Sequence, residues 1–216
     1  MKTLLNKERT LAASPLSYWF LVFTVMTMLP NYPILVGTVF VCLGLFYSFQ
    51  STRETNDILY TALLPVRKGD VVRAKYAFCC EIEGIAFGLM AALTAVRMTL
   101  LREVEVYAQT AMMNANPDYL AYALLIFMLF NVIFLRGFFK TAYQIGWPLI
   151  GFMVASFLLV AAGETLHHIP GLLFLNSMEE GLGIQAAVLA AAILIYVLET
   201  RGACSQAVKS FEALDL

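Results

Sequence analysis

Charged side chains are scarce in this 216-residue chain: Lys, Arg, Asp and Glu make up 13% of it, while hydrophobic residues make up 61%. A soluble domain is about half apolar and about a quarter charged. The mean hydropathy of +0.78 points the same way. The composition therefore predicts an integral membrane protein with little soluble mass. The net charge of −1 says nothing about partners, but no stretch of the sequence looks like a nucleic-acid surface, so no nucleic acid is expected among them.

Metal-binding residue types are few and poorly spaced. The two histidines, His167 and His168, are adjacent and would point in different directions on a helix. A metal site needs a closed set of ligands with defined geometry, so no metal site is predicted. Free thiols are expected for the four cysteines, which show no metal-site spacing. These are Cys42, Cys79, Cys80 and Cys204.

Sequence motifs for catalysis are missing as well. The chain has no G-x-x-x-x-G-K-[ST] phosphate loop, no H-E-x-x-H and no G-x-S-x-G. It is therefore predicted not to be an enzyme, to have no catalytic residues and to bind no cofactor of its own. The N-terminus spreads its charges and has no compact apolar core before a cleavage site, so no removed signal peptide is expected.

Apolar segments recur along the whole chain, which is therefore predicted to form a single transmembrane domain, residues 1–216. The fold class predicted is all-α: six transmembrane helices, an N-terminal interfacial helix and a cytoplasmic helix in the long polar interruption. The second apolar segment, 34–49, is short against the roughly 20 residues that a helix needs to cross. Spans one and two could instead form a hairpin that does not fully cross. The predicted parts are an interfacial helix 1–10, spans one and two in 11–49, a cytoplasmic segment 50–75, spans three to six in 76–199, and a cytoplasmic tail 200–216.

The distribution of basic residues predicts the orientation. With the N-terminus inside, all Lys and Arg residues except Arg97 and Arg102 fall on the cytoplasmic side. Loops that stay in the cytoplasm carry such an excess. We therefore expect a multi-pass membrane protein with both termini in the cytoplasm. The inner residues are Lys2, Lys7, Arg9, Arg53, Arg67, Lys68, Arg73, Lys75, Arg136, Lys140, Arg201 and Lys209.

The stretch 51–76 is the one long polar interruption between apolar segments. Ser51 and Glu54 fit a capping box that begins a helix. Pro65 should end that helix, because proline removes a backbone donor and disfavours helix in the residue before it. Asp70 is then expected to cap the next helix. The pattern predicts a short amphipathic helix that lies in a partner's groove or in the headgroup layer.

Three polar residues within the spans are candidates for a transport pathway: Glu81, Glu83 and Asn131. Carboxylates inside a membrane are costly and usually face protein or water. Glu81 and Glu83 could instead lie near the inner headgroups and pair with Arg73, Lys75 or a neighbouring span. Because they are two residues apart, they cannot point the same way on a helix. Asn131 also suits a hydrogen bond between helices.

Span three carries Gly84, Gly88 and Ala92 at four-residue intervals, and span six has similar alanine pairs. Small residues at this spacing let helices approach closely in lipid. Packing within this one chain is the interpretation favoured over a dimer interface.

The polar interruption resembles the cytoplasmic loop between spans two and three of ABC-2 type exporter permeases. The similar residues are Asn56-Asp57-Ile58-Leu59, Leu63-Leu64-Pro65-Val66-Arg67-Lys68, Val71-Val72 and Lys75-Tyr76. Within that family the chain is most similar to the small six-span bacterial permeases, which include exporters of phenol-soluble modulins and bacteriocin-related peptides. The resemblance implies a location in the bacterial plasma membrane and a coupling helix that docks on an ABC ATPase, with ATP and Mg bound in that partner. The implied docking residues are Glu54, Asn56, Asp57, Leu59, Leu63, Leu64, Pro65, Val66 and Arg67.

The leading hypothesis is thus the permease subunit of an ATP-driven exporter. It would assemble with two ATPase subunits and a second permease, identical or different, in the lipid bilayer, and move an amphipathic peptide. One alternative is an ion-coupled secondary transporter, for which only Glu83 and Asn131 offer ion-binding groups. The other is a non-transporting immunity or sensor subunit, because export and sequestration need the same surfaces.

Overall fold

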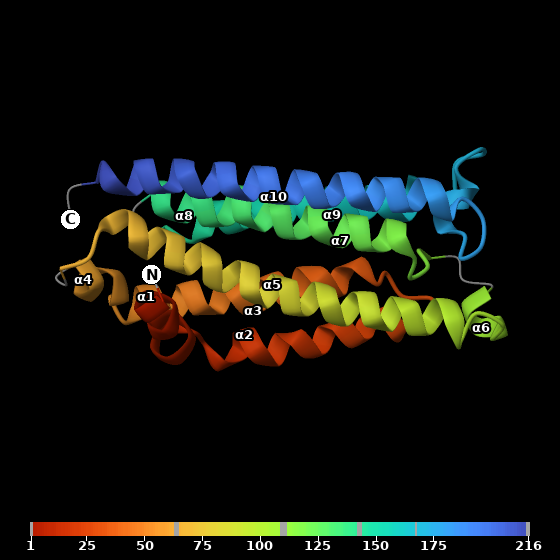
Figure 1. The fold of residues 1–216 in the computed structure, drawn as a ribbon, viewed down its shortest axis with the longest axis horizontal. Coiled ribbons are helices and arrows are strands. Elements are labelled where there is room, and N and C mark those ends of the chain that lie inside the picture. The colour runs from red at the N-terminus through yellow and green to blue at the C-terminus, as the bar shows by residue number, and fades with distance from the viewer. Residues whose placement is uncertain (1, 63–64, 109–111, 142–143, 167, 215–216) are drawn as a thin grey trace.

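A computed structural model describes residues 2–62, 65–108, 112–141, 144–166 and 168–214, and within these ranges the chain forms helices and connecting turns without a strand. The helices make an elongated all-α bundle, with both termini and the short helix α4 at the same end (Figure 1). In chain order they are α1 (Lys2–Lys7), the π-helix η1 (Glu8–Ala12), α2 (Pro15–Trp19), the 3₁₀-helix η2 (Phe20–Met28), α3 (Leu35–Glu54), α4 (Asp57–Ala62), α5 (Lys68–Thr99), α6 (Glu105–Ala108), α7 (Pro117–Leu129), the π-helix η3 (Phe130–Leu135), α8 (Arg136–Lys140), α9 (Gly146–Leu166), the 3₁₀-helix η4 (Leu173–Asn176) and α10 (Leu182–Glu212).

Five of the described helices are long and apolar enough to cross a membrane, and a bent pair brings the number of candidate spans to six. The pair consists of Lys2–Ala12 and Pro15–Met28, which meet at 92°. The bend has a local cause. Proline disfavours helical backbone in the residue before it, and Ser14 accordingly has an extended ψ of 137° while its side chain accepts a hydrogen bond from the Leu16 amide. The first eleven described residues therefore turn away from the first span.

The first two spans are closer to crossing length than the sequence suggested. α3 does not stop at residue 49 but continues to Glu54, giving 20 residues. In the span before it, η2 is a nine-residue 3₁₀-helix. A 3₁₀-helix rises about 2.0 Å per residue, so nine residues extend roughly 18 Å instead of the roughly 14 Å of an α-helix. The expected shortness of the second span was wrong, because Phe49 and Thr52 are buried and the helix continues past them.

Glycines on α3 bring this helix against the first span. A Cβ atom added at Gly37 would lie 2.7 Å from the Phe23 carbonyl oxygen, and one added at Gly44 would lie 2.5 Å from the Phe20 Cβ. Both distances are too short for real contacts, so the close approach of α3 and η2 depends on the missing side chains.

Phenylalanine rings fill the core between α3, η3, α8 and α9. The Phe49 ring centroid lies 5.5 Å from that of Phe134 and 5.0 Å from that of Phe138. Phe130 meets Phe152 edge to face at 5.2 Å. Such edge-on pairs are stabilised beyond the burial of their area, so this part of the bundle is packed rather than open.

The small residues of α5 do not pack within the chain, which corrects the sequence prediction. A Cβ atom at Gly84 or Gly88 would meet nothing within 4 Å, and Ala92 is exposed. The reason is rotational: α5 directs its other face, with Ile82 and Met90, into the core. The alanine pairs of α10 at 186/190 and 187/191 are exposed as well.

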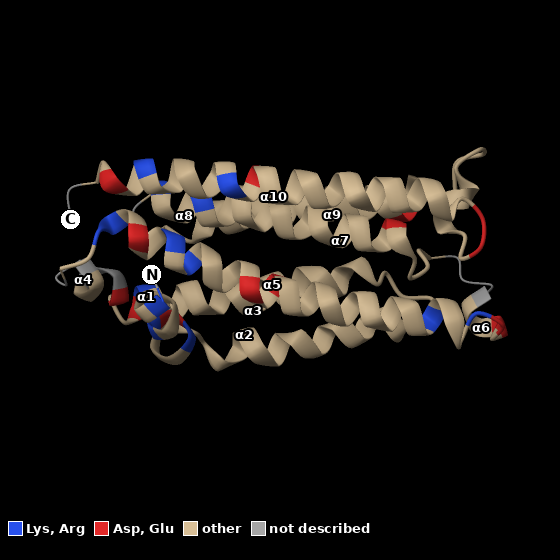
Figure 2. Cartoon of the chain, in the orientation of Figure 1, with Lys and Arg blue, Asp and Glu red and all other residues tan. Residues whose placement is uncertain are grey.

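The two ends of the bundle differ in charge. Basic residues gather at the end that holds α1, α4 and the last turns of α10, here called the basic end (Figure 2). At the opposite end Arg97 is buried, with 1% of its surface exposed. It donates to the Thr27 carbonyl at 2.8 Å and to Asn114 Oδ1 at 3.2 Å. Arg102 pairs with Glu179 at the surface of the same end.

Candidate functional site

The short helix α4 occupies the middle of the polar segment 50–75 at the basic end, close to α1 (Figure 1). Asn56 joins it to α3 with a left-handed φ of 52°, a conformation that asparagine tolerates better than most residues. Six residues of this segment are helical in α4, which is shorter than the predicted helix. Glu54 belongs to α3 instead, while Pro65 follows α4 as expected of a helix stop.

Two predicted helix caps in this segment are wrong. α3 runs without a break through Ser51 and Glu54, and the Thr55 amide donates to the Ser51 carbonyl oxygen at 3.0 Å. Ser51 is therefore inside a helix and starts none. α5 begins at Lys68, three residues after Pro65, so Asp70 lies in its first turn rather than at the cap.

Lys7 ties α4 to the N-terminal helix. Its Nζ lies 2.7 and 2.8 Å from the two carboxylate oxygens of Asp57 and donates to Thr61 Oγ1 at 2.7 Å. Asp57 and Thr61 are one turn apart on α4, and Thr61 is buried. One lysine thus fixes the inner face of α4 against α1.

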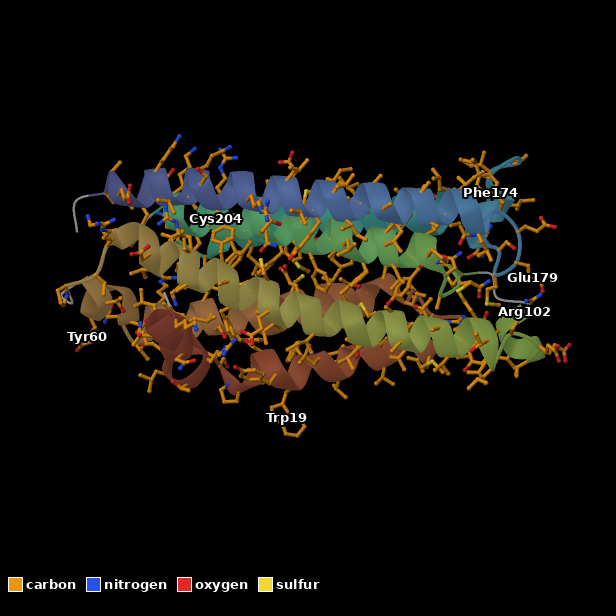
Figure 3. The ribbon with its side chains drawn as sticks, viewed as in Figure 1. Trp19, Tyr60, Arg102, Phe174, Glu179 and Cys204 are labelled. Atoms are coloured by element: carbon orange, nitrogen blue, oxygen red, sulfur yellow. The ribbon has the colours of Figure 1, made fainter. Side chains whose placement is uncertain are left out.

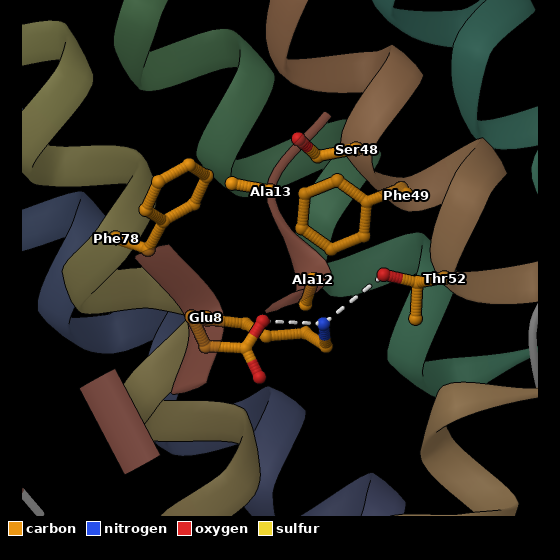
Figure 4. A pocket seen from close by; sticks show the side chains of 8 residues that line it. Glu8, Ala12, Ala13, Ser48, Phe49, Thr52 and Phe78 are labelled. Carbon is orange, nitrogen blue, oxygen red and sulfur yellow. Dashed lines mark hydrogen bonds and ion pairs between the residues drawn. The ribbon is translucent and has the colours of Figure 1, made fainter. Parts of the chain in front are cut away.

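A buried ion pair joins the next residue of the N-terminus to α5. Lys75 Nζ donates to Glu8 Oε2 at 2.7 Å and to Thr52 Oγ1 of α3 at 3.2 Å (Figure 4). The side chains of Lys75 and Glu8 are 3% and 4% exposed. Asp57 lies 3.8 Å from the same ammonium. Charges buried this deeply are stable only when paired and hydrogen-bonded. We call Lys7, Glu8, Asp57 and Lys75 the elbow network.

A small cavity lies beside the elbow network (Figure 4). Its volume is about 10 Å³, which is the room that one water molecule needs. The cavity offers no space for a transported molecule, so the elbow network serves to hold α1, η1, α4 and α5 together. The cavity is lined by Glu8, Ala12, Ala13, Ser48, Phe49, Thr52, Lys75 and Phe78.

The outer side of the polar segment faces away from the bundle. Tyr60, on α4, exposes 69% of its surface and lies at the tip of the basic end (Figure 3). Among the predicted docking residues that the structure describes, Glu54, Asn56, Pro65 and Arg67 are exposed, and Asp57 and Val66 are half-buried. Leu59 lies in α4, whereas the predicted contacts Leu63 and Leu64 lie outside the described residues.

Glu81 and Glu83 point into different surroundings. Glu81 forms an ion pair with Arg9 of η1, with 2.7 Å between Oε1 and Nη2. Both side chains are about two-fifths exposed, at 35% and 42%. The partner is therefore neither Arg73 nor Lys75, the two residues of α5 named as alternatives. We call α1 and η1, residues Lys2–Ala12, the N-terminal elbow. Glu81 is an additional link between this elbow and α5 and contributes nothing to the core.

Glu83 lies in the core and contacts Asn131, the third of the predicted pathway residues. Asn131 Nδ2 donates to Glu83 Oε2 at 2.9 Å and to Thr200 Oγ1 of α10 at 3.3 Å. The hydroxyl of Tyr196, also on α10, donates to the same Glu83 oxygen at 2.6 Å. The hydroxyl of Tyr76 donates to the Asn131 backbone carbonyl at 3.1 Å. These contacts join α5, η3 and α10 in a buried polar cluster.

The polar cluster has two unusual features. Asn131 is the second residue of the π-helix η3, and single π turns occur frequently at functional sites. In addition, Glu83 Oε1 and Asn131 Oδ1 are buried oxygen atoms without a hydrogen-bond partner among the described residues. Buried polar atoms in native proteins are nearly always paired, so each of these two oxygens calls for a hydrogen-bond donor.

Sequence reasoning missed several members of both sites. Glu8 carries the strongest signal: it is an acidic residue between Lys7 and Arg9 in an otherwise basic N-terminus. Tyr196 and Thr200 are four residues apart, and hence on one face of a helix, at the boundary between the predicted last span and the predicted tail. Thr52 and Thr61 carry no signal, because a threonine in a helix has many roles.

One of three comparisons with known proteins gave a match. A protein-family model described as "ABC-2 family transporter protein" matches residues 3–200. The matched range includes the N-terminal elbow from residue 3 onward, α4 and the whole polar cluster. Searches of curated proteins and of solved structures gave no match.

Proposed function

Because the chain belongs to the ABC-2 family of transporter proteins, we propose that it is the permease subunit of an ATP-driven exporter. The family is a membrane transport component of ABC transporters, and its membership implies a multi-pass permease and an ABC ATPase as partner. The energy would come from ATP and Mg in that separate chain, since no phosphate loop occurs in this sequence.

We propose that α4 and its flanking residues are the coupling element. This proposal rests on the contacts of α4. Lys7 binds the inner face of the helix through Asp57 and Thr61, while Tyr60, on the same helix, is exposed. A helix fixed on one side and free on the other can receive a partner. A push on its outer face would pass through Asp57 and the elbow network to Lys75 on α5.

The basic end is proposed to face the cytoplasm. It holds nearly all Lys and Arg residues (Figure 2), and cytoplasmic ends of membrane proteins carry this excess. In this orientation α4 is on the side where an ATPase is found. The α1–η1 segment would lie in the inner interface with its basic side chains toward anionic headgroups.

The assembly proposed is two permeases with two ATPase subunits. Six spans make half of a pathway, so the route would run between this chain and a second permease, identical or different. An amphipathic peptide is proposed as the cargo because of the similarity to the small peptide exporters of the family. Glu83 and Asn131 remain candidates for the pathway. Both are buried in this structure, so a cargo could contact them only if α5 and α10 moved apart.

Co-purification with the ABC ATPase encoded beside this chain tests the coupling element. The wild type should form a stable complex in detergent, and Tyr60→Asp or Leu63→Asp should lose it. Tyr32→Asp is the matched control, because Tyr32 is an exposed tyrosine in the turn that connects η2 and α3 at the opposite end. Loss of the complex in the control alone, or in none of the three, would show that α4 is not the docking site.

Flux into inverted vesicles separates the exporter from the alternatives. An exporter accumulates labelled peptide only with ATP and the ATPase present, and continues after the proton gradient has been collapsed. A secondary transporter would show the reverse dependence. A subunit that only binds peptide would give no accumulation under either condition.

A further inference from the structure

The buried polar cluster is short of one hydrogen atom. Glu83 Oε2 accepts two hydrogen bonds, from Asn131 Nδ2 and from the Tyr196 hydroxyl, whereas Glu83 Oε1 accepts none from the described part of the chain. Asn131 uses both hydrogens of its amide nitrogen, on Glu83 and on Thr200. Its own oxygen, Oδ1, has no donor among the described residues. Glu83 and Asn131 thus share one hydrogen bond, and each is left with one oxygen, Oε1 and Oδ1, that has no donor among the described residues.

Rotation of the Asn131 amide does not remove the shortage. The oxygen and nitrogen of an amide are exchanged by a half turn. The exchange would place an oxygen where Nδ2 now lies, 2.9 Å from Glu83 Oε2. Two oxygens at that distance need a hydrogen between them. Either orientation therefore lacks one donor.

The surroundings of Glu83 supply no cation that would favour a carboxylate. No Lys or Arg of the described chain lies within ion-pair distance of it, whereas Glu81, two residues earlier, is paired with Arg9. The titratable groups that face Glu83 are neutral in their ordinary state: Cys42 of α3, Cys79 and Cys80 of α5, and Tyr196 of α10. An unpaired charge in this position would be costly in a bilayer.

We propose that Glu83 is a proton-binding site in the core of the bundle, with Asn131 as its partner. A proton from water adds to Oε1, an O–H bond forms, and the charge of the side chain falls from −1 to zero. The new hydroxyl donates to Asn131 Oδ1. The carboxyl and the carboxamide are then joined by two hydrogen bonds in opposite directions, and both unmatched oxygens are satisfied.

The bound proton would link chemistry to helix packing. Neutral Glu83 holds together α5, η3 and, through Tyr196, α10. Loss of the proton leaves a buried carboxylate whose Oε1 has no donor among the described residues, so α10 must move from α5 or water must enter. The site is thus a proton-dependent contact between two spans. It does not depend on the ATPase or on the cargo.

Infrared difference spectroscopy of the purified protein in lipid nanodiscs at neutral pH tests the proposal. Subtracting the spectrum of Glu83→Gln from that of the wild type should leave the C=O band of a protonated carboxyl, which shifts in D₂O. Glu81→Gln is the matched control and should leave only carboxylate bands. Tyr196→Phe should displace the protonated band, because it removes one donor to Oε2. Carboxylate bands alone in the Glu83→Gln difference would overturn the proposal.

Thermal unfolding gives an independent measurement. Glutamine is neutral at every pH and keeps an acceptor at Oε2 and a donor at Oε1, so Glu83→Gln should unfold at the wild-type temperature in acidic buffer, where Glu83 is protonated in the folded and the unfolded chain alike. As the pH rises, the unfolded chain loses this proton before the folded chain does, so the wild type should become progressively less stable than Glu83→Gln from acidic through neutral to alkaline buffer. A Glu83→Gln variant that fails to fold while Glu81→Gln folds would contradict the proposal. So would stabilisation of the wild type by sodium that Glu83→Gln lacks, since the ligand would then be a metal cation.

Discussion

Lys75 Nζ lies 2.7 Å from Glu8 Oε2, and both side chains are almost fully buried. The two residues are 67 positions apart in the sequence, so the pair fixes the N-terminal elbow to the start of the third crossing helix. Glu81 repeats the connection closer to the surface through Arg9. The N-terminal helix is thus part of the bundle and contacts the inner face of α4 through Lys7 and Asp57.

Breaking this pair should destabilise the whole bundle. Glu8→Gln leaves a buried ammonium without its carboxylate, and removing one partner of a buried pair costs roughly 3–5 kcal/mol. The free energy of unfolding, measured in mixed micelles, should fall by that amount. Asp70→Asn is the control, because Asp70 and Arg73 form an exposed pair on the same helix and exposed pairs contribute about 0–1 kcal/mol. Equal losses in the two variants would show that the Glu8–Lys75 pair is not special.

The glycine contact between α3 and η2 gives a second prediction. In Gly37→Ala the new Cβ would lie 2.7 Å from the Phe23 backbone oxygen, which cannot swing away as a side chain can. Overpacking of this kind costs roughly 1–3 kcal/mol. A lowered unfolding temperature is therefore expected. Gly84→Ala adds the same methyl group to α5 where nothing lies within 4 Å, so its unfolding temperature should not fall. Destabilisation by Gly84→Ala alone would contradict the packing of both helices.

Arg97 is expected to hold the opposite end of the bundle together. It donates to the Thr27 carbonyl near the end of η2 and to Asn114, and its guanidinium lies 4.7 Å from the Tyr107 ring. Hydrogen bonds to a charged group contribute about 1.5–3 kcal/mol, so Arg97→Gln should lower the free energy of unfolding by about that much. Arg102→Gln, at an exposed pair with Glu179, should change it by less than about 1 kcal/mol. The comparison requires only unfolding curves of the two variants, and the reverse ranking would refute the assignment.

Cys204 provides a direct test of the proposed orientation. It lies on α10 toward the basic end (Figure 3) and lines an open hollow of about 440 Å³ with Arg73 and Arg201. In a variant that keeps only this cysteine, a membrane-impermeant maleimide should label inverted vesicles and leave intact cells unlabelled. Labelling of intact cells would place the basic end outside. Variants that keep only Cys42 or Cys79 are the controls, because both thiols are fully buried and should react only after denaturation.

Much of the fold could be predicted because it depends on local quantities. The length and hydropathy of each apolar segment indicate a span, and the polar segment 50–75 separates two of them wherever the helices pack. A proline at position 65 disfavours helix through the geometry of its own ring, and α4 spans Asp57–Ala62, before it. Errors arose where burial overrode such local signals. The Ser51–Glu54 pattern lost to the continuation of α3, whose residues Phe49 and Thr52 are packed inside.

The sequence by itself determined an all-α membrane bundle, the order of its spans, the place of α4 and the resemblance to one transporter family. Only the tertiary structure decided which face of each helix is buried, and therefore which polar groups meet. Glu83 finds Asn131 48 positions away, and Lys7 finds Asp57 50 positions away. A uniformly apolar helix has no amphipathic pattern to fix its rotation. In α5 the sequence does not show that Gly84 and Gly88 are exposed and that Glu83 is buried, because the rotation of the helix is set by its contacts with distant helices.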